Sequence, residues 1–239
     1  MSRRTRVLSA ALLAAVVLSG CNDSSDDASP DAAARSEPVL AETAVPQTAG
    51  PLTGAQMPAP AILGEGWSER ADPGAGHEDE TDPDAPSTQA RDVAELMDGL
   101  VPIGCPEAAV NIALPRPQYA LERTYAGPSG QPGVALVLEF ADAASPDGFL
   151  GALDRQIRAC PAAGADPRGP VALGFRGVTR TPEQVSALRQ EQGVDADPNQ
   201  YLVIAVRDGK RVALVFLADT RIAKAPAIGA DLIKAIRQT

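Results

Sequence analysis

The chain has 239 residues, enough for one domain with a long tail. Its formal net charge of −10 gives an acidic surface that repels nucleic acid and anionic lipid headgroups, so the composition excludes a nucleic-acid partner and a polybasic membrane patch. One tryptophan, three tyrosines and four phenylalanines are too few aromatic side chains for a sugar-stacking groove.

Residues 1–20 have the pattern of an export signal. Arg3, Arg4 and Arg6 precede an apolar run over residues 7–18, which has the length of a signal-peptide core. The run is shorter than the roughly 20 apolar residues of a transmembrane helix. We therefore predict a signal peptide over 1–20 that is removed, and the paired arginines leave both the general secretory and the twin-arginine export routes open.

The signal ends in Leu18-Ser19-Gly20-Cys21, which resembles the lipobox of bacterial lipoproteins. The resemblance implies that the Cys21 thiol takes a diacylglycerol and that the mature lipoprotein begins at Cys21 with acyl chains such as palmitate. Two acyl chains hold a protein stably on a bilayer. We expect a lipid anchor at the extracytoplasmic face of the cell membrane; the alternative is an ordinary signal peptide with an incidental cysteine.

Two polar stretches flank the first apolar segment of the mature chain. Residues 21–55 are rich in Ala, Asp, Ser, Pro and Thr and predict a disordered tether behind the lipidated cysteine. Residues 71–89 form an acidic loop that holds the single histidine. His77, Glu78 and Glu80 are weak candidates for a metal site, and a solvated loop without metal is the favoured interpretation.

The remaining chain, residues 56–239, predicts an α+β domain. We expect an antiparallel β-sheet with helices packed on one face. Predicted helices cover 92–100, 145–160, 181–191 and 226–237, and predicted strands cover 118–125, 134–140, 171–180 and the two arms of a hairpin over 201–216 that turns at Asp208-Gly209.

The face of the sheet that these helices leave uncovered has three possible covers. The segment 62–67 with Trp67, an open hydrophobic cleft, or a partner could each lie against it. We favour Trp67 as a core residue, and a role in lining a ligand groove is the alternative.

Once Cys21 is lipidated, Cys105 and Cys160 are the remaining cysteines of the chain. In an oxidising extracytoplasmic space such a pair is most simply a disulfide. A redox-active pair is the alternative, but the long spacing has no C-x-x-C signature.

The sequence shows little sign of catalysis. A hydrolase triad would have to use His77 in the acidic loop, and the chain has no G-x-S-x-G turn. Glu122 and Glu139 could act as acid and base across neighbouring strands, although separate solvated positions are favoured. No cofactor-binding motif is present in the sequence.

The features in order along the chain support one resemblance. The lipobox, the tether, the segment 62–67, Cys105 with the tyrosines after it, and a helix ending at Cys160 resemble actinobacterial lipoproteins with a PknH-like extracellular sensor domain. The resemblance covers residues 56–239 and implies a central antiparallel sheet with helices around a cleft. It implies no ligand residues.

Two functions follow as hypotheses. The favoured one is a non-catalytic binding or sensor-like module of the cell envelope, anchored through Cys21, with an envelope ligand or protein partner that the sequence does not identify. The alternative is an envelope hydrolase or metal-dependent enzyme that uses acidic residues.

Overall fold

The computed structural model describes residues 46–71, 86–100, 111–160, 174–192, 198–218 and 221–238, which all belong to one unit of the chain. The predicted lipidation and disulfide residues Cys21 and Cys105 lie outside these ranges. The three loop residues His77, Glu78 and Glu80 lie outside them as well.

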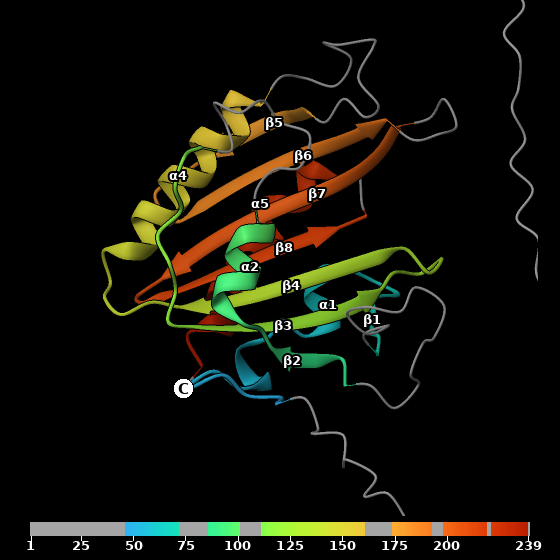
Figure 1. Cartoon of the computed structure of the whole chain (residues 1–239). Helices are drawn as coiled ribbons and strands as arrows, with labels where there is room; N and C mark the ends of the chain where they lie inside the picture. The colour runs from blue at the N-terminus through green and yellow to red at the C-terminus, as the bar shows by residue number, and fades with distance from the viewer. Residues whose placement is uncertain are drawn as a thin grey trace, which may run out of the picture. The chain divides into compact units, whose positions relative to one another are not determined.

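The described strands form one antiparallel sheet of eight strands, in the order β1-β3-β4-β8-β7-β6-β5, with β2 pairing beside β1 on β3 (Figure 1). The antiparallel α+β architecture predicted from the sequence is confirmed. The strands are β1 Ser68–Glu69, β2 Thr88–Ala90, β3 Tyr119–Ala126, β4 Pro132–Glu139, β5 Gly174–Arg180, β6 Gln184–Gln192, β7 Pro198–Asp208 and β8 Arg211–Leu217.

Tight turns set the register of the two central hairpins. Between β3 and β4, the Gly127 amide donates to the Gln131 carbonyl at 2.7 Å, and Gly130 has a positive φ of 77°. Between β7 and β8, Asp208 pairs with Arg211 and Gly209 has a φ of 55°, a conformation that glycine adopts without strain. The predicted hairpin over 201–216 is therefore confirmed.

The predicted helix over 181–191 is wrong, because these residues form a turn and strand β6. The Thr181 hydroxyl accepts from the Gln184 amide at 3.0 Å, which is the bond expected at a helix start, but here it closes the turn between β5 and β6. Strand β6 then pairs with β5 on one side and β7 on the other. Long-range pairing on both edges outweighs the local preference for a helix.

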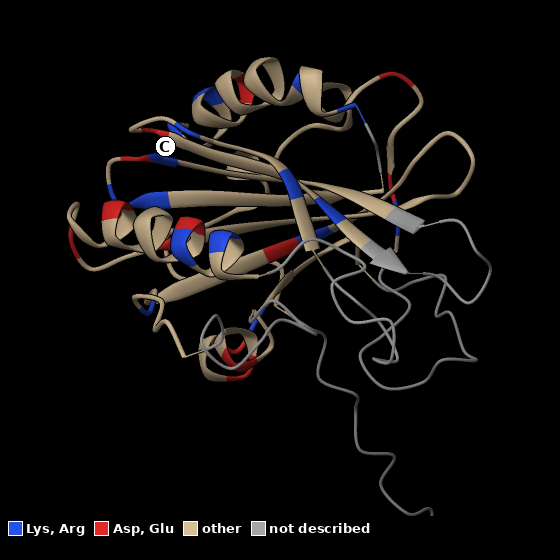
Figure 2. Cartoon of the chain, turned by 90° about the horizontal axis from the view of Figure 1, so that it is seen from above, with Lys and Arg blue, Asp and Glu red and all other residues tan. Residues whose placement is uncertain are grey.

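Helices cover both faces of the sheet, whereas the sequence predicted helices on one face. The helices in the described residues are α1 Pro60–Leu63, α2 Val93–Gly99, α4 Ser145–Ala159, α5 Ala225–Ile236 and the short 3₁₀ turns η1 Gly54–Gln56 and η2 Ile222–Lys224. Figure 1 shows α2 and α4 in front of the sheet and α5 behind it, and Figure 2 shows the helices on both sides. The cause lies in the central strands, whose two alternating sets of side chains are both apolar and both need cover.

One hydrophobic cluster lies on each face. We call the side with α5, α1 and Trp67 the closed face; its strand residues include Leu121, Val137 and Val215. We call the side with α2 and α4 the open face; its strand residues include Leu136, Val203 and Leu214.

The start of helix α4 is fixed by Asp142. Ser145 is the first helical residue, and the Asp142 carboxylate accepts from the amides of Ala144 and Ser145 at 2.9 and 2.8 Å. These hydrogen bonds from Ser145 and Ala144 lower the pKa of the Asp142 carboxyl. The helix predicted over 145–160 is confirmed, and its side chains Phe149, Leu150 and Ile157 are buried on the sheet.

Residues just before position 56, where the domain was predicted to begin, pack against the sheet. Leu52 is wholly buried on the closed face, and Met57 lies beside it in the same cluster. Thr53 and Gln56 form a reciprocal capping box around η1, and the Gln56 amide donates to the Gln238 carbonyl at 2.6 Å. The buried side chain of Leu52 and the capped turn η1 therefore attach this last part of the predicted tether to the domain.

Candidate functional site

A cavity of about 360 Å³ lies on the open face of the sheet. Most of its lining is apolar. The described residues that line it are Arg91, Leu96, Gly99, Leu100, Glu122, Val134, Leu136, Leu153, Ile157, Phe175, Arg189, Val203 and Phe216.

The sheet forms the floor of this cavity and two helices supply side chains to its walls. Val134 and Leu136 come from β4, Val203 from β7 and Phe216 from β8, so the floor crosses the middle of the sheet. Helix α2 contributes Leu96 and α4 contributes Leu153 and Ile157 in separate walls. The volume and the apolar lining match those of pockets that bind small molecules, which range from about 300 to 1,000 Å³.

Val134 and Phe216 show that the open face is incompletely covered. Both residues lie on central strands, pair directly with each other and are only half-buried. Their neighbours that point to the closed face, Ala135 and Val215, are wholly buried. The cavity is therefore the part of the sheet that α2 and α4 leave uncovered.

The polar groups of the lining lie on well-separated strands. Arg91 Nη1 and Glu122 Oε1 form an ion pair of 3.1 Å, with side chains 23% and 13% exposed. Arg189 extends from β6, whereas Glu122 extends from β3, and four inter-strand spacings separate these strands. At about 4.8 Å per spacing, the two backbones are roughly 19 Å apart. The cavity is thus apolar in its middle and has charged groups toward both ends.

Local hydrogen bonds set the position of Arg91 and of the helix that follows it. The Arg91 amide donates to the Ala120 carbonyl at 3.0 Å, which continues the β2-β3 pairing and brings the side chain to Glu122. The next residue, Asp92, caps α2 by accepting from the Glu95 amide at 2.9 Å. The helix predicted over 92–100 is confirmed, and its start is fixed to strand β3.

Gly99 leaves room in the wall of the cavity. It is the last residue of α2, and a Cβ added there would meet no heavy atom of the described residues within 4 Å. A larger side chain would therefore begin beside the cavity in space that the described residues leave open.

Trp67, the weak candidate for ligand binding, lies in the core of the closed face, which is the position that the sequence favoured. Its side chain packs against Gly133 and is 7% exposed. It is not among the residues that line the cavity. Its indole Nε1 is buried without a hydrogen-bond partner in the described part of the chain.

The two glutamates considered as an acid and base pair extend to opposite faces of the sheet. Glu122 lies on the open face with Arg91. Glu139 pairs with Arg211 at 2.6 Å, and Arg211 also donates to the carbonyl of Ile236 at the end of α5 on the closed face. With a sheet between them, the two carboxylates cannot flank one substrate bond.

The remaining predicted site residues lie in or beside the parts of the chain that are not described. Cys160 ends α4 and is disulfide-bonded, and since Cys105 is outside the described residues, their pairing stays a prediction. No group of three or more histidine, cysteine, aspartate or glutamate side chains in the described ranges could hold a metal ion. No helix in those ranges has the length and apolar composition of a membrane span.

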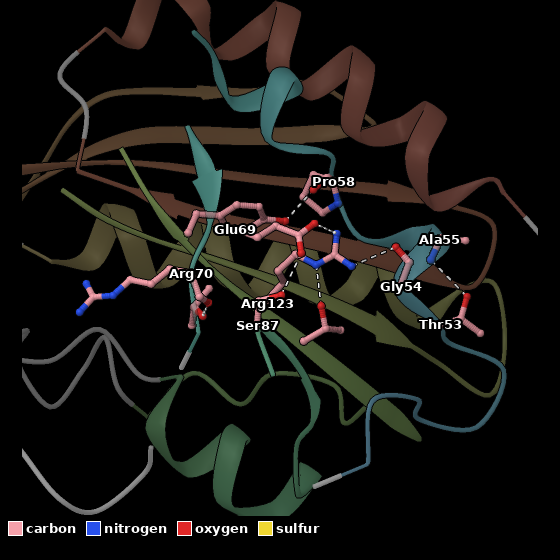
Figure 3. A network of polar contacts seen from close by, with 11 residues as sticks. Thr53, Gly54, Ala55, Pro58, Glu69, Arg70, Ser87 and Arg123 are labelled. Carbon is pink, nitrogen blue, oxygen red and sulfur yellow. Dashed lines mark hydrogen bonds and ion pairs between the residues drawn. The ribbon is translucent and has the colours of Figure 1, made fainter. Parts of the chain in front are cut away.

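A polar network on the closed face was missed by the sequence analysis (Figure 3). Arg123 pairs with Glu69 at 2.9 Å and donates to the hydroxyl of Thr88 at 2.6 Å. The hydroxyl of Tyr125 donates to the Pro58 carbonyl at 2.6 Å. These bonds fasten the first segments of the domain to β3.

Burial raises the pKa of the Tyr125 phenol well above its usual range. The nearby Arg123 guanidinium acts in the opposite direction, but its effect is smaller than that of desolvation. Tyr125 is therefore a neutral hydrogen-bond donor of the core, and its bond to Pro58 is structural.

Comparison with known proteins finds similarity among solved structures. No family model and no curated protein matches the chain. Among solved structures, the chain is similar to the crystal structure of the extracellular domain of PknH from Mycobacterium tuberculosis, with 11% sequence identity and a TM-score of 0.42. The match covers 65% of this chain and 87% of that chain. At this identity and TM-score, no residue role or ligand carries over to the present chain.

Proposed function

We propose that this protein is a non-catalytic binding module of the cell envelope, with an elongated apolar ligand in the cavity of the open face. The observation that carries the proposal is the cavity itself: about 360 Å³ of space over half-buried Val134 and Phe216. Exposed apolar surface on the central strands of a sheet favours a ligand that removes it from water.

The chemistry of the lining supports binding rather than catalysis. Its charged side chains are two arginines and one glutamate, and that glutamate is paired with Arg91. Among the described lining residues there is no histidine, cysteine, serine or lysine that could act as a nucleophile or general base. Such a lining can orient a ligand, and a sensor-like role would consist in reporting its presence.

The anchoring part of the proposal rests on the sequence around Cys21. If Cys21 carries the lipid, Cys21→Ser leaves the chain without its acyl anchor, and we expect the variant to lose its resistance to extraction from membranes by high salt or carbonate. Membrane fractionation with a matched Cys105→Ser variant measures this. Retention of the Cys21→Ser chain in the membrane as firmly as the unchanged protein would contradict the lipid anchor.

Filling the cavity tests the binding function. In Gly99→Phe the new side chain starts in the open space of the wall, so we expect it to abolish stabilisation by apolar ligands while the fold remains. Gly151→Phe is the matched control: Gly151 is also a helical glycine, it does not line the cavity, and the nearest contact of an added Cβ is the flexible end of Arg155 at 3.6 Å.

The readout is a thermal-shift and native mass-spectrometry screen with envelope lipids and long-chain alcohols. We expect binding to the unchanged chain and to Gly151→Phe, and none to Gly99→Phe. Equal binding to both variants would place the ligand outside the cavity, and no binding to any of the three proteins would overturn the proposed function.

A further inference from the structure

We infer that the cavity binds one unbranched alkyl chain laid across the strands of the open face, and that its floor is complementary to a chain of about twelve carbons. This inference rests on the proposed function, since it names the class of ligand for the same cavity. The observations that carry it are the pairing of the strands beneath the cavity, the burial of the floor side chains and the positions of the charged groups.

The pairing of the strands gives the floor its direction. Val134 on β4 pairs with Phe216 on β8, and Phe216 pairs with Val203 on β7. All three residues line the cavity, and their strands lie side by side in Figure 1. Because paired residues lie directly opposite each other, the three side chains form one row perpendicular to the strands.

The floor is narrow along the strands. Strand β4 contributes Val134 and Leu136, which are successive residues of one face and lie about 7 Å apart. Strands β7 and β8 contribute one described residue each. The row is therefore one or two side chains wide, and a ligand covers the most apolar surface when its long axis runs across the strands.

Charged side chains end the apolar part of this row. Glu122 on β3 pairs with Leu136 in the sheet and forms the ion pair with Arg91 at 3.1 Å. Arg189 is on β6, one strand beyond Val203. Since each of these charged groups is already engaged in an interaction, we assign no ligand head to any of them. The apolar part covers the three strands β4, β8 and β7, which is about 14 Å across.

An unbranched alkyl chain matches this row in length and in width. A residue of extended backbone has three bonds and spans up to about 3.6 Å, so an extended chain of single bonds advances roughly 1.2 Å per bond. About twelve carbons therefore reach across about 14 Å. Methylenes above Val134 and Phe216 would cover side chains that are half-buried, whereas further methylenes would displace water from the charged groups on β3 and β6.

A series of saturated n-alkanoates from octanoate to hexadecanoate tests the length of the floor, because all members share one head group. Each is titrated calorimetrically, below its critical micelle concentration, into the full chain with Cys21→Ser, so that no acyl group of the protein competes. We expect each methylene up to about twelve carbons to raise the affinity about fourfold, and longer chains to add little. A rise that continues unchanged to hexadecanoate would overturn the length assigned to the floor.

The isomer 2-butyloctanoate tests the width of the floor. It has the same atoms and the same head group as dodecanoate, but its carbons are divided between two shorter arms. A row one or two side chains wide can hold only one of these arms, so we expect the isomer to bind about tenfold more weakly than dodecanoate, or weaker still. Equal affinities would overturn the single row.

Val134→Gln places a polar amide on β4 and shortens the apolar row from three strands to two. The affinity should then stop rising at about eight carbons, and dodecanoate should lose about tenfold or more. Val178→Gln is the matched control, because Val178 is also a half-buried valine of the open face but does not line the cavity. The control should keep the length dependence of the unchanged chain. The same limit in a folded Val134→Gln protein would overturn the position of the ligand over β4.

Failure of the inference is distinguishable from failure of the proposed function. Alkanoates that bind without the limit in length, or without the preference for the unbranched isomer, overturn the inference alone. Binding of no member of the series overturns the proposed function with it. The series and the isomer decide the inference on a chain with an unchanged cavity, even where a variant fails to fold.

Discussion

The closed and open faces of the sheet share the same strands but differ in how completely helices cover them. On β4, Val137 points to the closed face and is wholly buried, whereas Val134 points to the open face and is half-buried. Behind the sheet, α5 and the segment around Trp67 fill the space; in front, the seven-residue α2 and the distant α4 leave a gap. Both faces therefore contain a packed core, but only the open face has the cavity within the described residues.

Truncating one leucine on each face should give the largest difference in stability between the two faces. Leu232→Ala removes a wholly buried side chain of α5 and should lower the free energy of unfolding by about 3 kcal/mol, because it opens a cavity in a filled core. Leu100→Ala, at a half-buried position that already lines a cavity, should cost about 1 kcal/mol or less. Urea unfolding measures both variants, and equal losses would contradict the difference between the faces.

Replacing one arginine on each face should give the next largest difference in stability. Arg211 pairs with Glu139 and donates to the carbonyls of Ile236 and Gln238, so Arg211→Gln should cost about 2 kcal/mol. Among the described residues of the open face, Arg91 forms one ion pair, with Glu122, and Arg91→Gln should cost about 1 kcal/mol. Chemical denaturation of the two variants tests this order; a larger loss for Arg91→Gln would reverse the comparison.

Replacing Tyr125 should change the stability by less, and this change should depend on pH. Tyr125→Phe removes the hydrogen bond to Pro58 and should cost about 1 kcal/mol at neutral pH. The exposed Tyr119 is the control, and Tyr119→Phe should leave the stability nearly unchanged.

The raised pKa of Tyr125 predicts how this stability changes in alkali. Because the folded protein holds the phenol proton more tightly than the unfolded chain does, the contribution is complete below the ordinary tyrosine pKa of about 10 and is lost as the pH rises above it. Tyr125→Phe should therefore flatten the fall in stability above that pH. An equally steep fall in the variant would show that other groups cause it.

Local patterns predicted most of the elements but not the site. The amphipathic spacing in 145–160 and the apolar arms around Asp208-Gly209 are properties of single segments, and both elements are present in the structure. The segment 181–191 carries a helix-start signal, and only its pairing with two neighbouring strands shows that it is β6. Long-range pairing of this kind is not visible in a local pattern.

The cavity could not be predicted for the same reason. Arg91, Glu122 and Arg189 are far apart in the sequence, and Arg189 lies in the segment expected to be helical. The signal that could have indicated β6 is the alternation of Val185, Ala187 and Arg189, which all extend to the open face. An open hydrophobic cleft was, however, one of the three possibilities that the sequence allowed for the second face of the sheet.

The most direct test of a ligand site on the open face is a methyl NMR titration of the full chain with dodecanoate. Methyl groups of Leu100, Val134 and Leu153 line the cavity and should shift in a saturable way, whereas those of Val137 and Leu232 on the closed face should stay in place. Shifts confined to the closed face, or no saturable shifts at all, would contradict the account.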